Sequence, residues 1–282
     1  MRIAVTGAGG MLGTDVTSEL RRRGHTVVAL SRPGFDIQDR EQAAAAAGDA
    51  DAIVNCAAWT AVDDAETQEA AAFALNAVVP QTLARVTREA GIPLVHVSTD
   101  YVFDGEASEP YDEDAVLAPR SAYGRTKAAG EWAVRSGNPD HWLLRTAWLY
   151  GASGGCFPKT IARLAADRDE LRVVDDQVGQ PTWTVDVADR IASLLEAEAP
   201  YGTYHATSSG RASWHAFAER VVAASGGPAA VLPTTSDEFP RPAPRPAWSV
   251  LGHRRWHEAG IEPIGDWRER WELASSSVLG LR

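Results

Sequence analysis

Tyr123 and Lys127 lie four residues apart in the segment SAYGRTKAAGE, residues 121–131. On a helix, this spacing places both side chains on one face. A free tyrosine has a pKa of about 10, and a nearby ammonium favours its ionised form, so the pair could transfer a proton near neutral pH. The same spacing also occurs in ordinary surface pairs, so the surrounding elements must decide which interpretation holds.

Polar and aromatic side chains end two neighbouring apolar runs. Ser98 and Thr99 end the run at 93–99, and Trp148 ends the run at 142–148. Parallel strands form ligand sites at their carboxyl ends, so we expect these side chains near the tyrosine and the lysine. A hydroxyl, an acidic phenol and an ammonium beside a nicotinamide would form a site that reduces a ketone.

The elements that position these residues alternate between buried strands and amphipathic helices. This alternation predicts an α/β protein with a Rossmann-type, doubly wound parallel sheet and right-handed crossovers. The expected strands are 2–6, 26–30, 52–55, 93–99 and 142–148, and the expected helices between them are 11–23, 39–47, 67–91 and 121–136.

The length of 282 residues indicates one large domain or two unequal ones. Residues 1–150 are predicted to form an NAD(P)-binding Rossmann domain, with a return segment near 172–200. Residues 151–171 and 201–282 are predicted to form a smaller, mainly C-terminal α/β substrate domain. Its proline-rich segment, 239–248, should be an extended loop because proline disfavours helix.

A glycine-rich loop, VTGAGGMLG, follows the first expected strand and opens the first helix. Gly7, Gly10 and Gly13 would permit a tight turn and the close approach of a pyrophosphate to the helix N-terminus. A glycine turn without a ligand is the alternative. The position of the loop in the first strand–helix turn favours dinucleotide binding.

The end of the second strand bears on the choice of cofactor. Ser31 and Arg32 stand where an acidic residue would accept hydrogen bonds from the ribose of NAD, and arginine suits the 2′-phosphate of NADPH. We therefore expect NADPH, with NADH possible, although Arg32 could also be a solvated surface residue. Asp36 and Ile37 could bracket the adenine, or Asp36 could cap the next helix.

Composition excludes several classes of partner. A formal charge of −11 disfavours nucleic acid. Cys56 and Cys156 form no CxxC motif, so we expect two reduced thiols and no metal site. The chain shows no signal peptide and no run of 18 apolar residues, so we expect a cytoplasmic protein without a membrane partner.

Five further segments occur in order along the chain: STDYVFDG (98–105), YGRTKAAGE (123–131), RTAWLYG (145–151), VVDDQVGQPT (173–182) and RPAWSVL (245–251). Together with the glycine loop, they closely resemble the dTDP-4-dehydrorhamnose reductases, a family of extended short-chain dehydrogenase/reductases. The resemblance runs from residue 1 nearly to the end. It implies NADPH-dependent reduction of the C4 keto group of dTDP-4-dehydro-6-deoxy-L-mannose to dTDP-L-rhamnose, with the smaller domain binding the sugar nucleotide.

The resemblance also implies roles for individual residues. Thr99 would contact the 4-keto group, Tyr123 would donate the proton, and Lys127 would position the ribose and tune Tyr123. Asp100 and Trp148 would touch the sugar nucleotide. Arg245 is a candidate phosphate contact, unless it is merely solvated. Besides the three glycines, the tyrosine and the lysine, the cofactor residues expected are Met11, Leu12, Ser31, Arg32, Asp36, Ile37, Ala57, Ala58, Trp59 and Val97.

Some positions depart from the family pattern. Gly155 and Cys156 stand where the family often has two asparagines, which puts hydrogen bonds near the substrate, and the identity of the sugar, in doubt. Trp59 is larger than the usual residue there. The motifs fit a reductase of another dTDP-4-keto-6-deoxysugar equally well. A non-catalytic dinucleotide-binding regulatory subunit is the other alternative. We expect a monomer or a homodimer.

Overall fold

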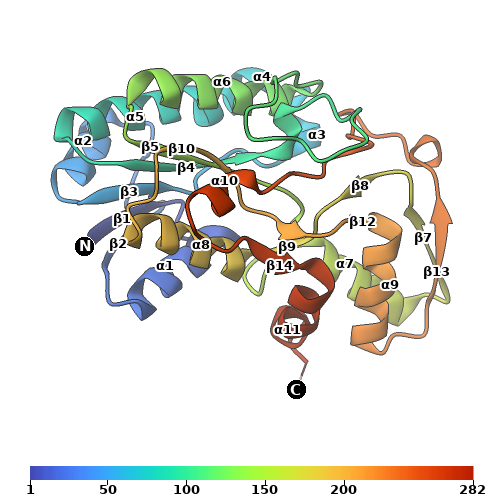
Figure 1. Ribbon diagram of the computed structural model, residues 1–282. Coiled ribbons are helices and arrows are strands. Elements are labelled where there is room, and N and C mark those ends of the chain that lie inside the picture. The colour runs from blue at the N-terminus through green and yellow to red at the C-terminus, as the bar shows by residue number, and fades with distance from the viewer. Residues whose placement is uncertain (282) are drawn as a thin grey trace.

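A central parallel sheet of six strands organises the protein, in a computed structural model that describes residues 1–281. The strand order is β10-β5-β4-β3-β1-β2, and every neighbouring pair is parallel (Figure 1). The strands are β1 (Arg2–Thr6), β2 (Thr26–Leu30), β3 (Ala52–Asn55), β4 (Leu94–Thr99), β5 (His141–Thr146) and β10 (Gly202–His205). The α/β Rossmann-type fold predicted from the sequence is confirmed.

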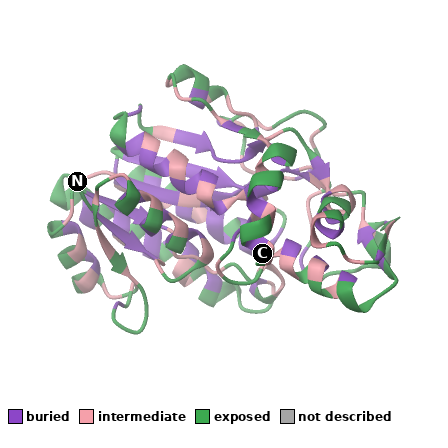
Figure 2. Ribbon diagram, turned by 90° about the horizontal axis from the view of Figure 1, so that it is seen from below, coloured by how far each residue is buried: buried purple, intermediate pink, exposed green. Residues whose placement is uncertain are grey.

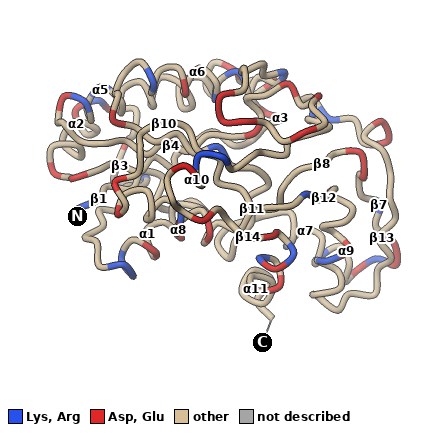
Figure 3. The backbone as a smooth tube through the Cα atoms, in the orientation of Figure 1, with Lys and Arg blue, Asp and Glu red and all other residues tan. Residues whose placement is uncertain are grey.

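Helices cover both faces of this sheet, which explains the continuous apolar runs of its strands. The helices α2 (Arg40–Gly48), α5 (Val79–Ala90) and α6 (Ala122–Gly137) lie on one face. The helices α1 (Met11–Arg22) and α8 (Thr184–Glu196) lie on the other. Figure 2 shows the strands as the buried layer, and Figure 3 shows charges of both signs on the surrounding helices and loops.

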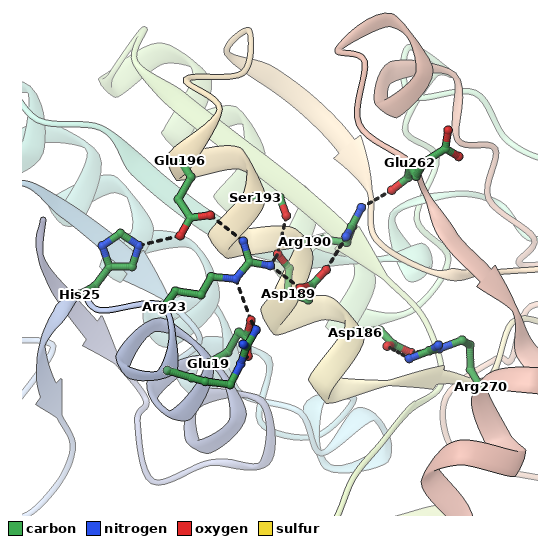
Figure 4. A network of polar contacts seen from close by, with 11 residues as sticks. Glu19, Arg23, His25, Asp186, Asp189, Arg190, Ser193, Glu196, Glu262 and Arg270 are labelled. Atoms are coloured by element: carbon green, nitrogen blue, oxygen red, sulfur yellow. Dashed lines mark hydrogen bonds and ion pairs between the residues drawn. The ribbon is translucent and has the colours of Figure 1, made fainter.

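A polar network joins α1, α8 and the C-terminal segment (Figure 4). Arg23 pairs with Glu19 on α1 and with Asp189 and Glu196 on α8. Arg270 of α11 (Trp267–Leu279) pairs with Asp186 on α8 in the same way. Because these groups are partly exposed, we expect each pair to contribute little to stability.

The smaller part of the molecule has its own aromatic core. Phe217, Trp267 and Trp271 pack between α7 (Phe157–Asp167), α9 (Trp214–Ser225) and α11. The parallel strands here are β7 (Glu170–Val174) with β13 (Ala230–Thr234), β6 (Leu149–Tyr150) with β9 (Thr182–Trp183), and β11 (Ser208–Ser209) with β14 (Ile264–Asp266). The antiparallel pair is β8 (Val178–Gly179) with β12 (Ala212–Ser213).

The remaining elements are short and lie in the connections. They are α3 (Val62–Ala65), α4 (Glu69–Phe73), the π-helix Ala74–Val78, the 3₁₀ turns Asp100–Val102 and Ser236–Glu238, and α10 (Arg254–Glu258). The helix expected over 67–91 runs without a break from Glu69 to Ala90, with a π-helical turn at Ala74–Val78 in its middle. Pro80 has no N–H to donate, which interrupts regular helical hydrogen bonding at this point. The proline-rich segment 239–248 contains no helix or strand of the described structure.

The sixth strand of the main sheet is β10, within the range that we assigned to the substrate domain. By contrast, β7 lies near the start of the expected return segment and pairs with β13 in the smaller part. Residues 202–205 thus belong with the main sheet. The division into two domains otherwise stays a prediction.

Within residues 1–281, no helix is both long and apolar enough to cross a bilayer.

Candidate active site

A cleft of about 910 Å³ opens at the carboxyl ends of the strands, from β1 to β5. It begins at the glycine loop and ends at the N-terminal half of α6. Of the residues predicted from the sequence, those that line it are Gly7, Gly10, Met11, Leu12, Gly13, Ser31, Arg32, Asp36, Ile37, Ala57, Ala58, Val97, Thr99, Asp100, Tyr123, Lys127 and Trp148. The structure thus brings nearly the whole predicted set to one place.

The phenol and the ammonium project into this cleft from α6. The Ser121 hydroxyl caps the helix by accepting the Gly124 N–H at 3.0 Å, so the helix begins just before Tyr123. Tyr123 is 8% exposed and Lys127 is 2% exposed. Thr99 ends the neighbouring strand β4 and donates from Oγ1 to Oδ1 of Asp100 at 2.8 Å.

The protonation of Tyr123 differs from the sequence-based expectation. Burial raises the pKa of the phenol well above its usual value, the Thr99 hydroxyl opposes this change, and the Asp100 carboxylate adds to it. The expected lowering by Lys127 was wrong for this structure, because burial and the Asp100 carboxylate both raise the pKa of the phenol. The result is a phenol that holds its proton at neutral pH, as a proton donor must.

Lys127 is anchored on the strand rather than on the tyrosine. Its Nζ donates to the carbonyl oxygen of Val97 at 2.6 Å. Burial lowers the pKa of the ammonium to about 8, while the carboxylate of Glu131, one turn further along α6, counteracts part of this shift. Close to neutral pH, Lys127 remains mostly charged.

Asp100 places a buried carboxyl group in the cleft. Burial raises the pKa of its carboxyl to about 6, and the hydroxyls of Thr99 and Ser249 oppose the change. Tyr101, which follows it, contacts Tyr123 edge to face, with ring centroids 5.5 Å apart. We did not predict Tyr101 as a site residue, although its place within the STDYVFDG segment was a usable signal.

The glycine loop has the shape that a dinucleotide phosphate requires. Gly7 has φ +68°, and a Cβ on Gly13 would lie 2.1 Å from the Gly7 carbonyl oxygen. Gly10 caps α1 without a side chain, so the N-terminal N–H groups of this helix remain accessible from the cleft. At the end of β2, Ser31 and Arg32 are exposed at the cleft wall. These residues fit a dinucleotide cofactor.

Comparison with known proteins shows which family has this sequence and this cleft. The family described as "RmlD substrate binding domain" matches residues 1–278. The dTDP-4-dehydrorhamnose reductase of Streptomyces griseus is 50% identical over 275 residues, which cover 95% of this chain and 90% of the relative. The chain belongs to the dTDP-4-dehydrorhamnose reductase family. The resemblance inferred from the sequence motifs is confirmed.

Two further proteins are similar to this member of the dTDP-4-dehydrorhamnose reductase family over nearly its whole length. The crystal structure of the Bacillus anthracis dTDP-4-dehydrorhamnose reductase in complex with NADP matches with a TM-score of 0.93 and 35% identity, covering 97% of this chain and 98% of that one. A Streptomyces antibioticus protein, a probable dTDP-4,6-dihydroxy-2-methyloxan-3-one 4-ketoreductase, is 48% identical over 99% of this chain and 96% of its own length.

Two residues predicted from the family pattern do not line the main cleft. Trp59 packs in the cluster around Tyr123, and its indole N–H donates to the Ala61 carbonyl at 3.0 Å. Arg245 lies 2.9 Å from the carboxylate of Asp63 and lines a separate cavity of about 140 Å³. Their contacts with cofactor and substrate stay predictions.

Other features of this reductase-family cleft were missed or assigned differently. Asp39, not Asp36, caps α2, accepting the N–H groups of Glu41 and Gln42, so the capping alternative for Asp36 was wrong. Ser98 lines the cleft as expected, with its hydroxyl donating to Glu131 at 2.7 Å. The lining residues that we had not predicted are Gly9, Leu30, Phe35, Gln38, Cys56, Thr60, Val62, Leu75, Tyr101, Thr146, Ala147, Leu149, Gly154 and Gly155. Gly155 lines the cleft at one of the positions that depart from the family pattern. Within residues 1–281, no group of three potential metal ligands is found.

Proposed function

We propose that this chain reduces the C4 keto group of dTDP-4-dehydro-6-deoxy-L-mannose with NADPH to give dTDP-L-rhamnose. One observation carries the proposal: a buried, protonated phenol, a hydroxyl and an ammonium lie in the same cleft as the glycine loop. Membership of the dTDP-4-dehydrorhamnose reductase family supports the choice of substrate.

The cofactor-binding groups are spread along one side of the cleft. The N–H groups at the start of α1 would bind the pyrophosphate, and Arg32 would bind the 2′-phosphate. Lys127, fixed to the Val97 carbonyl, would contact the nicotinamide ribose. When bound, NADPH supplies a hydride to C4 of the sugar.

The residues at the other side of the cleft act on the carbonyl oxygen. As negative charge develops on that oxygen, Tyr123 transfers its phenolic proton to it, and the Thr99 hydroxyl stabilises it by a hydrogen bond. The carbonyl carbon gains the hydride and the oxygen gains the proton, so the ketone becomes an alcohol. Lys127, one helical turn further along α6, stays fixed to the Val97 carbonyl during this step.

Reduction of another dTDP-4-keto-6-deoxysugar is the second candidate. The relative from Streptomyces antibioticus carries a name of that class. Gly155 lines the cleft where the family often has an asparagine, so the contacts that select the sugar differ at this point. A purely regulatory dinucleotide-binding role is less well supported, because Thr99, Tyr123 and Lys127 all remain in the cleft.

Product analysis tests the proposal. The purified protein is incubated with NADPH and dTDP-4-dehydro-6-deoxy-L-mannose, and the sugar nucleotide formed is examined by NMR. We expect consumption of NADPH and formation of dTDP-L-rhamnose. A product with the opposite configuration at C4 would favour the second candidate, and the absence of NADPH oxidation with any dTDP-4-keto-6-deoxysugar would contradict both.

A further inference from the structure

Trp148 adopts an unusual backbone conformation at the wall of the cleft. Its φ is +48°, in the left-handed region that a bulky side chain rarely occupies. It comes two residues after Thr146, which lies opposite Thr99 in the register of β4 and β5. The backbone of Trp148 is held by its carbonyl oxygen, which accepts the Thr182 N–H at 3.2 Å. Because this backbone conformation is unfavourable, we expect packing of the side chain to hold Trp148 in place as well.

The indole lies against two residues of the smaller part of the molecule. The ring of Trp214 stacks on it, with centroids 3.5 Å apart and planes 6° from parallel. A Cβ on Gly179 would lie 2.5 Å from Cε2 of Trp148, so only glycine leaves room for the indole in this position. We name Gly179 and Trp214 the indole clamp.

The two halves of the clamp come from one paired structure. In the antiparallel pair of β8 and β12, Gly179 is opposite Ala212, two residues before Trp214. Ser213 then caps α9 by accepting the Ala216 N–H at 3.1 Å, which fixes Trp214 as the first residue of that helix. The pairing and the cap together determine where the indole of Trp214 lies.

The clamp also borders the other side chain that we expect to touch the sugar. The Cβ position of Gly179 lies 2.7 Å from the hydroxyl of Ser249. That hydroxyl donates to the Val178 carbonyl oxygen at 3.5 Å, and it opposes the rise in the pKa of Asp100 in the cleft. Gly179 therefore packs against both the Trp148 indole and the Ser249 hydroxyl.

We propose that Gly179 and Trp214 are positioning residues, which hold the Trp148 indole against the sugar of the bound sugar nucleotide. The inference rests on the proposed function, since it assumes that the sugar lies beside Trp148. Because Trp214 stacks on Trp148, only the remaining surface of that indole is left to contact the ligand. A flat, fixed aromatic surface binds a pyranose at a low cost in conformational entropy.

A purely structural role for Trp214 makes a different prediction. Trp214 also packs on Phe157, with centroids 4.5 Å apart, so its loss removes contacts within the smaller part as well. A structural loss would weaken the binding of dTDP-L-rhamnose and of dTDP alone to a similar degree. Loss of the clamp should weaken only the ligand that carries the sugar.

The test compares the dissociation constants of dTDP-L-rhamnose and dTDP by calorimetry, with NADP⁺ present, for the wild type, Trp214→Phe and Trp214→Leu. We expect Trp214→Leu to weaken dTDP-L-rhamnose by about two- to tenfold, the factor that an aromatic pair contributes, with dTDP nearly unchanged. Trp214→Phe should retain most of the affinity. Trp132→Leu, at an indole 56% exposed on α6, is the matched control and should change neither constant.

Gly179→Ala tests the clamp from its other side and covers the case in which Trp214→Leu does not fold. We expect it to weaken dTDP-L-rhamnose selectively as well. Folded variants that keep the wild-type ratio of the two dissociation constants would overturn the inference.

A second experiment needs no ligand. The near-ultraviolet circular dichroism spectra of Trp148→Leu, Trp214→Leu and the double variant are compared with that of the wild type. If the spectral changes of the two single variants add up to that of the double variant, the two indoles are not coupled and the inference is overturned. Failure of the wild type to reduce the keto sugar would instead contradict the proposed function.

Discussion

Lys127 donates a hydrogen bond from Nζ to the carbonyl oxygen of Val97, across 2.6 Å, and so joins α6 to β4 two residues before Thr99. A second link lies close by, because the Ser98 hydroxyl donates to Oε1 of Glu131 at 2.7 Å. Glu131 is itself on α6, one turn beyond Lys127. The strand that carries the hydroxyl and the helix that carries the phenol are therefore fixed relative to each other by buried polar contacts.

Tyr123→Phe should abolish most of the activity without affecting the fold. The variant lacks the proton that the phenol transfers, so we expect kcat to fall by a factor of roughly 10² to 10⁴ while the affinity for NADPH stays close to that of the wild type. Steady-state kinetics and a fluorescence titration with NADPH measure both. Tyr201→Phe, at a ring 43% exposed, is the control. A variant that reduces the keto sugar at the wild-type rate would show that Tyr123 is not the acid.

Arg32→Ala should discriminate between the two nicotinamide cofactors. Only NADPH carries a 2′-phosphate, and a charge-assisted contact contributes about 1.5–3 kcal/mol, which corresponds to about ten- to a hundredfold in affinity. We expect the dissociation constant of NADPH to rise by that factor and that of NADH to change little. Arg40→Ala, an exposed arginine that pairs with Glu89 on α5, is the control. Equal changes for both cofactors would remove Arg32 from the phosphate site.

Removal of one partner from the buried pair of Glu131 and Arg145 should be strongly destabilising. Both side chains are fully buried, and two hydrogen bonds of 2.9 and 2.8 Å join them. Glu131→Gln leaves the Arg145 charge without its partner, so the free energy of unfolding should fall by about 3–5 kcal/mol. Urea unfolding measures this loss. The same substitution at the exposed Glu89 should change stability by less than about 1 kcal/mol, and equal effects at both sites would contradict the prediction.

Lys127 should make stability depend on pH in the alkaline range. Burial lowers the pKa of its ammonium from 10.5 to about 8. Below pH 8 both folded and unfolded chains carry the charge, so the folded protein bears the full cost of burying it. Between pH 8 and 10.5 the folded protein loses the proton first, and this cost disappears.

The measurement is the melting temperature of Lys127→Met and of the wild type at a series of pH values. We expect the difference between the two to depend on pH. The variant should gain stability relative to the wild type below pH 8, and this gain should shrink as the pH rises to 10.5. Lys159→Met, which removes the same side chain from α7, is the matched control. A difference that stays constant across this range would contradict the burial of a charged Lys127.

The sequence predicted those parts of the structure that local patterns determine. Buried β-branched runs identified β1 to β5, and helical spacing placed Tyr123 and Lys127 on one face of α6. The glycine loop could be located because its turn requires glycine at Gly7 and Gly13. These features depend on residues close together in the chain.

The features that were missed depend on contacts between distant segments. The strand β10, with the sequence GTYH, has no apolar run of its own and is fixed by pairing with β5. Arg245 meets Asp63 only because the proline-rich loop lies beside α3. The raised pKa of Tyr123 is likewise a consequence of burial by the whole fold, which the spacing to Lys127 could not indicate.

Transfer of an isotopic label tests the central claim most directly. The wild-type protein is incubated with dTDP-4-dehydro-6-deoxy-L-mannose and NADPH that carries deuterium in place of the transferred hydrogen, and the position of deuterium in the sugar is read by NMR. We expect deuterium at C4 of dTDP-L-rhamnose, with the new hydroxyl proton derived through Tyr123 from solvent. A reduced sugar without deuterium at C4, or with deuterium at another carbon, would contradict hydride transfer to the C4 carbonyl in this cleft.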